Sequence, residues 1–160
     1  MVEPETDAAR FWHFALSVYR PDDNRALFLR IQDEGGADVP LVLFCLWCGA
    51  ERWCVSNEAM RAAVDFSTTW RQARVEPLRA LRRGWKGVVG NMPADLSEQA
   101  RQHVAQAEQA IERLQMGYLA ALREGARPVE NAARANLDLY CRLAVPALTP
   151  DDLDRLASLV

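Results

Sequence analysis

The 160-residue sequence has no apolar run long enough to cross a bilayer. Its longest unbroken apolar run covers residues 39–50, which is 12 residues, whereas a transmembrane helix needs about 20. The first residues are acidic, whereas a secretory signal begins with positive charge followed by an apolar stretch. We therefore expect a soluble, cytoplasmic protein with no membrane span.

Residue types that carry chemistry are also scarce. The chain has two histidines and four cysteines, and it lacks a nucleotide-binding loop, an array of metal ligands and a nucleophile with a recognisable base. His13 lies on the polar side of a predicted helix and His103 in a polar stretch, and neither has a carboxylate or thiol partner that the sequence reveals. We therefore expect a non-catalytic protein without cofactor or metal, and the alternative is an enzyme whose pocket residues are too dispersed along the chain to recognise.

A metal or redox site would have to be built from Cys45, Cys48, Cys54 and Cys141. Cys45 and Cys48 form a C-x-x-C pair, but the pair lies inside the apolar run rather than at the exposed start of a helix, where a thiol becomes reactive. Structural zinc usually needs two closely spaced ligand pairs, and this chain has one. The pattern favours thiols packed in the core, with a metal- or thiol-dependent sensor as the alternative.

Start and stop signals divide nearly the whole chain into amphipathic helices. Thr6 predicts a helix over Asp7–Tyr19, and Asp22 or Asp23 predicts one that stops at Gly35 and Gly36. Asp38 predicts a helix that begins with Val39 and Pro40, and Ser56 predicts one from Asn57 to about Lys86. Ser97 predicts a helix closed by Gly125, Pro128 one that runs through Cys141, and Thr149 a short last helix. Pro77 predicts a kink or break in the fourth helix, because proline lacks a backbone donor.

Two of these segments decide the architecture. The run Leu41–Cys48 has no polar side, so it is either a helix buried all round or a buried strand. We predict a helix because the Asp38 cap, the early Pro40 and the lack of a partner strand agree. The sequence thus predicts a single all-α domain over residues 1–160, an irregular bundle of six to seven helices around this central helix. In the fifth helix, a one-sided packing stripe is predicted from Val104, Ala107, Ile111, Leu114, Tyr118 and Leu122.

Charge is distributed unevenly along the chain. Residues 1–60 hold 5 Arg against 10 acids, residues 61–86 hold 7 basic residues against 2 acids, and residues 87–160 hold 7 Arg against 10 acids. Within the basic segment, four cations recur at i, i+3, i+4 and i+7, while leucines and a tryptophan occupy another flank of the same helix. We therefore expect the cations to share one exposed side.

The predicted partner-binding surface consists of Arg71, Arg74, Arg79, Arg82, Arg83 and Lys86. Such a surface can dock an acidic protein or neutralise phosphates, or it can be a solvated face that pairs with the acidic ends of the chain. The leading hypothesis is an adaptor or regulatory module with an acidic protein partner, because a pI near 5.4 argues against a dedicated nucleic-acid binder. A homo-oligomer is compatible with the sequence. A second candidate is a polar recognition edge formed by Gln32, Asp33 and Asp38, which otherwise serve as helix caps and solvated ends.

The chain has a set of distinctive segments at Phe11–Phe14, Tyr19, Ile31–Gly35, Asp38–Trp47 and Glu76–Arg83. In these segments it resembles a family of uncharacterised, conserved hypothetical proteobacterial proteins. Pro40 departs from the family pattern, which usually has Asn there, without disturbing a helix start. That family has no established activity, so the resemblance implies a bacterial, cytoplasmic, helical protein and supplies no catalytic residues.

Overall fold

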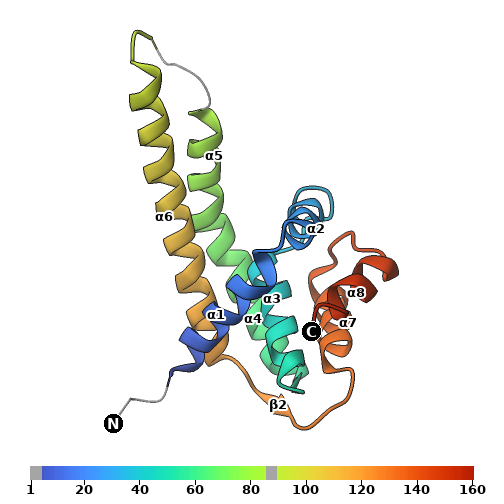
Figure 1. Cartoon of the computed structure of the whole chain (residues 1–160). Helices are drawn as coiled ribbons and strands as arrows, with labels where there is room; N and C mark the ends of the chain where they lie inside the picture. Colours follow the sequence, from blue (N-terminus) through green and yellow to red (C-terminus); the bar gives the residue numbers. More distant parts are fainter. Residues whose placement is uncertain (1–4, 86–89) are drawn as a thin grey trace. The chain divides into compact units, whose positions relative to one another are not determined.

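A computed structural model describes residues 5–85 and 90–160 (Figure 1). These residues form helices α1 to α8, one π-helical turn and two strands of two residues each, so the predicted all-α fold is confirmed. The chain divides into two compact units, Met1–Ser67 with Met116–Val160 (unit 1) and Thr68–Gln115 (unit 2). A single domain over residues 1–160 stays a prediction.

Unit 1 holds most of the helices. Its elements are α1 (Asp7–Tyr19), α2 (Asp22–Asp33), α3 (Val39–Ala50), β1 (Cys54–Val55), β2 (Gly125–Ala126), α7 (Ala132–Ala144) and α8 (Pro150–Ala157). Two longer helices belong to both units: α4 (Asn57–Trp70) begins in unit 1, and α6 (Ala94–Ala121) ends in it. Strands β1 and β2 pair antiparallel, with Cys54 opposite Ala126 and Val55 opposite Gly125.

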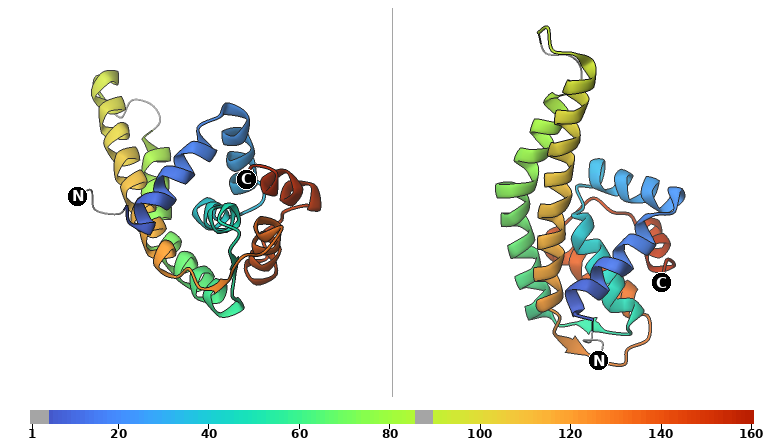
Figure 2. Two further views of the ribbon diagram at one scale, coloured as in Figure 1. Left: turned by 60° about the horizontal axis from the view of Figure 1, so that its bottom comes forward. Right: turned by 60° about the vertical axis from the view of Figure 1, so that its left-hand side comes forward.

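Helix α3 is the centre of the unit 1 core. All ten side chains from Val39 to Cys48 are buried, which confirms the prediction of a helix without a polar side. Its start is defined by Asp38, whose carboxylate accepts a hydrogen bond from the Leu41 N–H at 3.3 Å. Helix α3 packs most extensively against α7 and also contacts α1 (Figure 2). Against α1, the Phe11 ring stacks on the Trp47 indole with centroids 5.0 Å apart.

A buried amide holds β1 to the rest of the core. Asn136 of α7 accepts a hydrogen bond from the Val55 N–H at 2.8 Å, and its Nδ2 donates to the carbonyl oxygens of Trp53 at 2.8 Å and Cys45 at 3.3 Å. Buried backbone groups need such partners, because an unpaired one destabilises the fold by about 1–3 kcal/mol. Asn136 therefore supports a two-residue strand whose own pairing is minimal.

Unit 2 contains the end of α4, the π-helical turn Arg71–Val75, α5 (Glu76–Gly84) and the first part of α6. Helices α5 and α6 run side by side in this unit (Figures 1 and 2). The predicted kink near Pro77 is a wide turn, in which the Glu76 N–H donates to the Arg71 carbonyl oxygen five residues earlier. The π-helical turn thus ends two residues before Pro77, which lacks a backbone donor, and the helix continues as α5.

Three predicted helix starts are wrong. Pro21, not Asp22 or Asp23, precedes α2, and both aspartates lie in its first turn. Helix α6 begins at Ala94, so that Ser97 already donates its backbone N–H to the Pro93 carbonyl oxygen at 3.1 Å. Helix α7 begins at Ala132, four residues after Pro128. Each of these residues is of a type that is common at helix starts, but the helix begins at a different residue nearby.

The predicted packing stripe of α6 is only partly confirmed within unit 2, where Val104 and Ile111 are half-buried. Leu114 is 61% exposed and Ala107 is exposed, whereas Glu108 is 7% and Gln115 only 1% exposed. The period of the helix was predicted correctly, but the side that packs in unit 2 carries polar residues. The reason lies in the charges that α5 presents to it.

Candidate functional site

The predicted basic surface is split by the fold of unit 2. Arg79 is nearly buried, with its side chain 12% exposed, and its Nε lies 2.9 Å from Glu108 Oε1 while its Nη2 lies 2.7 Å from Glu112 Oε1. Arg82 Nε lies 2.7 Å from Glu108 Oε2. The two arginines of α5 therefore face α6, and Glu108 links them. The ion pairs with Glu108 and Glu112 raise the pKa of Arg79, which burial by itself would lower.

The expectation of one exposed basic side is therefore corrected for Arg79 and Arg82. Sequence spacing showed that the cations share a side of α5, but it placed that side in water because leucines were expected to face the core. In the structure, Leu81 is 44% exposed, and Arg79 lies on the packed side. Carboxylates at positions 108 and 112 make this arrangement favourable, because each buried guanidinium has a hydrogen-bonded counter-charge.

The remaining cations point outward or lie elsewhere. Arg74 and Arg83 are exposed, and neither has an acidic partner within the described part of the chain. Arg71 is partly buried, with its Nε 3.6 Å from Glu76 Oε1. Lys86 lies outside the described residues. Unit 2 as a whole carries eight basic and five acidic residues, so it is the basic part of an acidic chain.

The predicted polar recognition edge is not brought together. Asp38 is buried, caps α3, and donates its backbone N–H to the Tyr140 hydroxyl oxygen at 2.9 Å. Asp33 is exposed at the end of α2, beside the half-buried Gln32. Asp38 therefore belongs to the core, and we correct its assignment to a surface edge. The Asp38 carboxylate caps the start of α3, which is the role that an aspartate before a helix predicts.

Two of the four cysteines lie in the core, and the other two lie at its margin. Cys45 and Cys48 are fully buried, as predicted, and burial raises the pKa of both thiols. Cys54 and Cys141 are partly buried, and burial raises the pKa of Cys141 to about 11. Across residues 5–85 and 90–160, no three His, Cys, Asp or Glu residues form a group that could hold a metal ion.

An arginine cluster that the sequence did not reveal surrounds Glu51 at the end of α3. Arg10 and Arg127 form ion pairs with its carboxylate, and Arg123 Nη1 lies 2.5 Å from Oε2. The Arg123 guanidinium also lies 4.6 Å from the centroid of the Trp47 ring, in a cation–π contact. These residues lie up to 76 positions from Glu51, so no local spacing signals them. The cluster connects α1, the end of α3 and the residues on either side of β2, which is a structural role.

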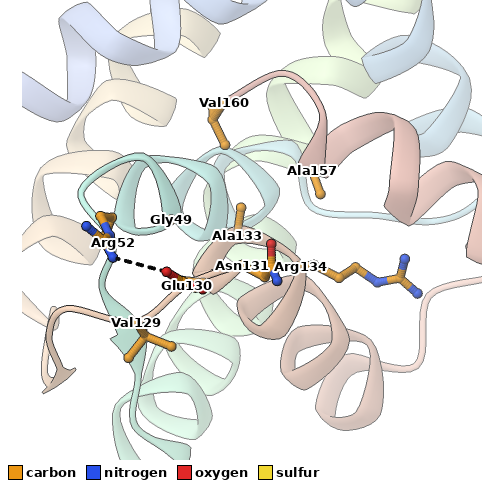
Figure 3. A pocket seen from close by; sticks show the side chains of 10 residues that line it. Gly49, Arg52, Val129, Glu130, Asn131, Ala133, Arg134, Ala157 and Val160 are labelled. Atoms are coloured by element: carbon orange, nitrogen blue, oxygen red, sulfur yellow. Dashed lines mark ion pairs between the residues drawn. The ribbon is translucent and has the colours of Figure 1, made fainter.

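A pocket of about 470 Å³ lies between the end of α3 and the start of α7 (Figure 3). Its charged lining includes Arg52 and Glu130, whose side chains form a loose ion pair at 3.9 Å. The Arg134 side chain extends away from this pair and binds Asp138 of its own helix at 3.0 Å. Gly49 and Ala133 close the pocket where the two helices touch. Its paired charges provide no selectivity for a ligand of either sign.

Both histidines are exposed, as the sequence predicted for solvent-facing residues. His13 Nδ1 lies 2.6 Å from Glu5 Oε1 on the surface of α1, and His103 lies on α6. Neither lies among the residues that line the pocket. Within the part of the chain that the structure describes, no helix is both long and apolar enough to cross a membrane.

Comparison with known proteins gives a family but no activity. A family model described as "Protein of unknown function (DUF2390)" matches residues 10–119, which is more than half of the chain. No curated protein and no solved structure matches. The matched residues include Glu51 and the basic residues of α5, whereas Arg123 and Arg127 lie beyond the match. The resemblance to an uncharacterised family is thus confirmed, and the chain belongs to the family of proteins of unknown function DUF2390.

Proposed function

We propose that the chain is a non-catalytic adaptor or regulatory module that binds an acidic protein through the outward side of unit 2. The observation that carries the proposal is the inverted arrangement of α5. Arg79 and Arg82 form ion pairs with carboxylates of α6. Leu81 is exposed instead, and so are Arg74 and Arg83. Bacterial origin and a cytoplasmic location stay predictions from the sequence.

The docking surface is smaller than the one expected from spacing alone. Arg74, Leu78, Leu81 and Trp85 follow one another at i, i+4, i+7 and i+11, so they share one helical side. Leu81 is exposed, and Leu78 and Trp85 are half-buried, which gives an apolar strip with a cation at one end. A strip of this kind fits an acidic, amphipathic partner segment, because apolar anchors give affinity and the charge gives orientation. Arg83 is exposed as well, but its position two and a half turns after Arg74 places it on the side of α5 opposite the strip.

Arg79 and Arg82 have a different role in this proposal. They hold α5 against α6 and thereby position the outward strip, so replacing them would disturb binding through loss of structure. A test of direct contact must therefore use residues from the exposed side. This separates Arg79 and Arg82, which are positioning residues, from Arg74, which is a contact residue.

The test is site-specific photo-crosslinking of the full chain in a lysate of the cells that produce it, where the salt concentration can be set. A benzophenone amino acid replaces Leu81 in one variant and the exposed Arg20 of unit 1 in the control. We expect a discrete adduct with an acidic protein from position 81 only. Its yield should fall as salt rises from 0.05 to 0.5 M, because exposed charges are screened over about 10 Å at 0.1 M.

A charge reversal completes the design. Arg74→Glu should reduce the adduct from position 81 at least fivefold, whereas Arg142→Glu, at an exposed site of α7, should leave it unchanged. Absence of an adduct, equal adducts from both crosslinking positions, or insensitivity to Arg74→Glu would each contradict the proposed function. Circular dichroism of every variant checks that the fold is retained.

A further inference from the structure

Helix α2 of unit 1 has an exposed side that is both apolar and acidic. Its core side carries three buried apolar residues. On the opposite side, Leu29 is 44% exposed, with the exposed Ala26 three residues before it and the exposed Asp33 four residues after it. We name these three residues the α2 face. An exposed leucine beside a carboxylate is the composition that the outward strip of α5 requires of a partner.

The carboxylate of the α2 face is open to a cation. Asp33 accepts a hydrogen bond from Gln32 Nε2 at 3.5 Å and forms no ion pair within the described residues. It is the last residue of α2, and Glu34, which follows it, is exposed as well. The C-terminal end of a helix carries partial negative charge, which adds to that of the two carboxylates. This end of α2 therefore attracts a cation more strongly than an isolated surface aspartate does.

Arg74 supplies the matching cation at one end of the outward strip. Its Nη1 donates to the Ala73 carbonyl oxygen at 3.1 Å. A guanidinium has five N–H donors, and the Arg74 side chain is exposed, so further donors face solvent. A carboxylate can accept two parallel hydrogen bonds from such a fork, which makes the pair stronger than a neutral hydrogen bond.

The two units carry net charges of opposite sign. Unit 2 has eight basic and five acidic residues, whereas unit 1 has eleven basic and seventeen acidic residues. When two copies meet, these charges favour an encounter of unit 2 of one copy with unit 1 of the other and oppose an encounter of like units. The chain therefore carries both halves of a charge-complementary pair of surfaces.

We propose that the acidic partner of the outward strip is a second copy of this chain, which binds through its α2 face. The inference rests on the proposed function, because it names the occupant of the same strip. The two helices run antiparallel, and the spacing of four and then three residues is the same along the strip and back along the α2 face. The residues that face each other are Arg74 and Asp33, Leu78 and Leu29, and Leu81 and Ala26.

The antiparallel direction follows from the charges at the two ends of α2. Asp22, in the first turn, already binds Arg25 at 2.9 Å. A parallel arrangement would bring Arg74 to this occupied carboxylate and would place Asp33 against Trp85. Removing a carboxylate from water without a cation is unfavourable. Antiparallel pairing gives Asp33 a cation of its own and leaves Asp22 with Arg25.

The contact is small. One helix from each copy buries less than the roughly 800 Å² per partner of a standard stable interface. We therefore expect an association that dissociates on dilution and weakens with salt. Each copy carries both surfaces, so the weight-average mass is the quantity to follow.

Sedimentation of the purified full chain over a hundredfold concentration series tests the proposal. The mass of the wild type should rise with concentration. Arg74→Glu and Asp33→Arg should each raise the apparent dissociation constant at least fivefold. An equimolar mixture of these two variants should return it to within threefold of the wild type, because the unchanged strip of one variant then meets the unchanged α2 face of the other. Only a contact between two chains is restored by mixing.

The matched controls make the same charge changes elsewhere. Asp65→Arg in α4 and Arg142→Glu in α7 alter exposed residues outside the contact, and each should change the dissociation constant less than twofold. Controls that weaken association as much as Asp33→Arg does would show an effect of net charge alone and would overturn the proposal. So would a wild type that stays monomeric, variants that associate like the wild type, or a mixture that does not recover.

A second variant covers loss of structure. If Arg74→Glu or Asp33→Arg loses its helical spectrum, Leu29→Ala replaces it, since alanine is fully compatible with a helix. Leu29→Ala should weaken association at least threefold, and unchanged association in this variant overturns the proposal.

Photo-crosslinking separates failure of this inference from failure of the proposed function. The adduct from position 81 should have twice the mass of the chain, with the crosslinked peptide coming from α2. Arg20 precedes α2 and lies outside the three facing pairs, so it remains the control position. An adduct with a different acidic protein that Arg74→Glu abolishes overturns this inference and leaves the proposed function standing. Absence of any adduct overturns both.

Discussion

Gly49 of α3 and Ala133 of α7 touch so closely that a Cβ added to Gly49 would lie 2.4 Å from both the Cα and the Cβ of Ala133. No side chain other than hydrogen fits between the two helices at this point. Gly49→Ala should therefore lower the free energy of unfolding by about 1–3 kcal/mol, the range for overpacking a core. Urea denaturation measures the change.

Gly117→Ala is the matched control for that substitution. Gly117 lies inside α6, and its added Cβ would meet only the Ala8 Cβ, at an ordinary 3.8 Å. The free energy of unfolding should rise by up to about 1 kcal/mol, because alanine favours a helix over glycine. Equal effects at positions 49 and 117 would contradict the close contact of α3 and α7.

Glu108→Ala should destabilise unit 2 more than any exposed ion pair does. The substitution removes the Arg82 ion pair with Glu108 and one of the carboxylates bound by Arg79. Removing one partner from a buried pair costs about 3–5 kcal/mol, and the partial exposure of Arg82 reduces our expectation to about 2–3 kcal/mol. Hydrogen exchange should show faster opening of amides in α5 and in the paired part of α6. Glu98→Ala, which removes an exposed pair with Arg101, should leave the free energy of unfolding nearly unchanged.

Stability at acid pH should depend on Asp152 of α8. The hydrogen bond from Arg30 and those from Thr149 lower the pKa of Asp152. A lowered carboxyl pKa contributes stability that is present above the unfolded pKa of about 3.9 and is lost as pH falls through the folded pKa. Asp152→Asn should therefore lower the melting temperature at pH 7 and flatten its decline below pH 4. A decline as steep as that of the wild type would contradict this role; Asp23→Asn, at an exposed site, is the control.

Stability at alkaline pH should depend on the buried thiols. Burial raises the pKa of Cys45 and Cys48, so their contribution is complete below the unfolded thiol pKa of about 8.5 and falls as pH rises towards the folded values. The free energy of unfolding should decline above pH 8.5 by at most about 1.4 kcal/mol per pH unit for each thiol. The double variant Cys45→Ala/Cys48→Ala should be less stable at pH 7 and show a flatter decline. Native thiol titration should find both residues slow until the protein unfolds, and rapid reaction would contradict their burial.

Helix starts were predictable where a single residue both signals and makes the cap. Thr6, Asp38 and Thr149 each accept a backbone hydrogen bond three residues ahead, as their sequence context indicates. Thr149 and Asp152 even form the reciprocal capping box. Helix α7 was misplaced because its start, at the left-handed Asn131, has no side-chain cap to recognise.

The orientation of amphipathic helices in unit 2 was not predictable from one sequence. The 3.6-residue period fixes which residues share a side of α5, but the packed side depends on the partner helix. Glu108 and Glu112 lie about thirty residues from Arg79, so nothing local indicates that this arginine is satisfied inside. The Glu51 cluster was not predictable for the same reason, because its arginines lie far from Glu51 in the sequence.

The strand pair β1–β2 joins Cys54 to Ala126 and Val55 to Gly125. The two strands therefore close a long loop that carries α4, α5 and α6, and the first part of α4 and the end of α6 still belong to unit 1. The entropy of closing a loop grows only slowly with the number of residues in it. Changes in the length of the α5–α6 hairpin should accordingly weaken the pairing of β1 with β2 very little.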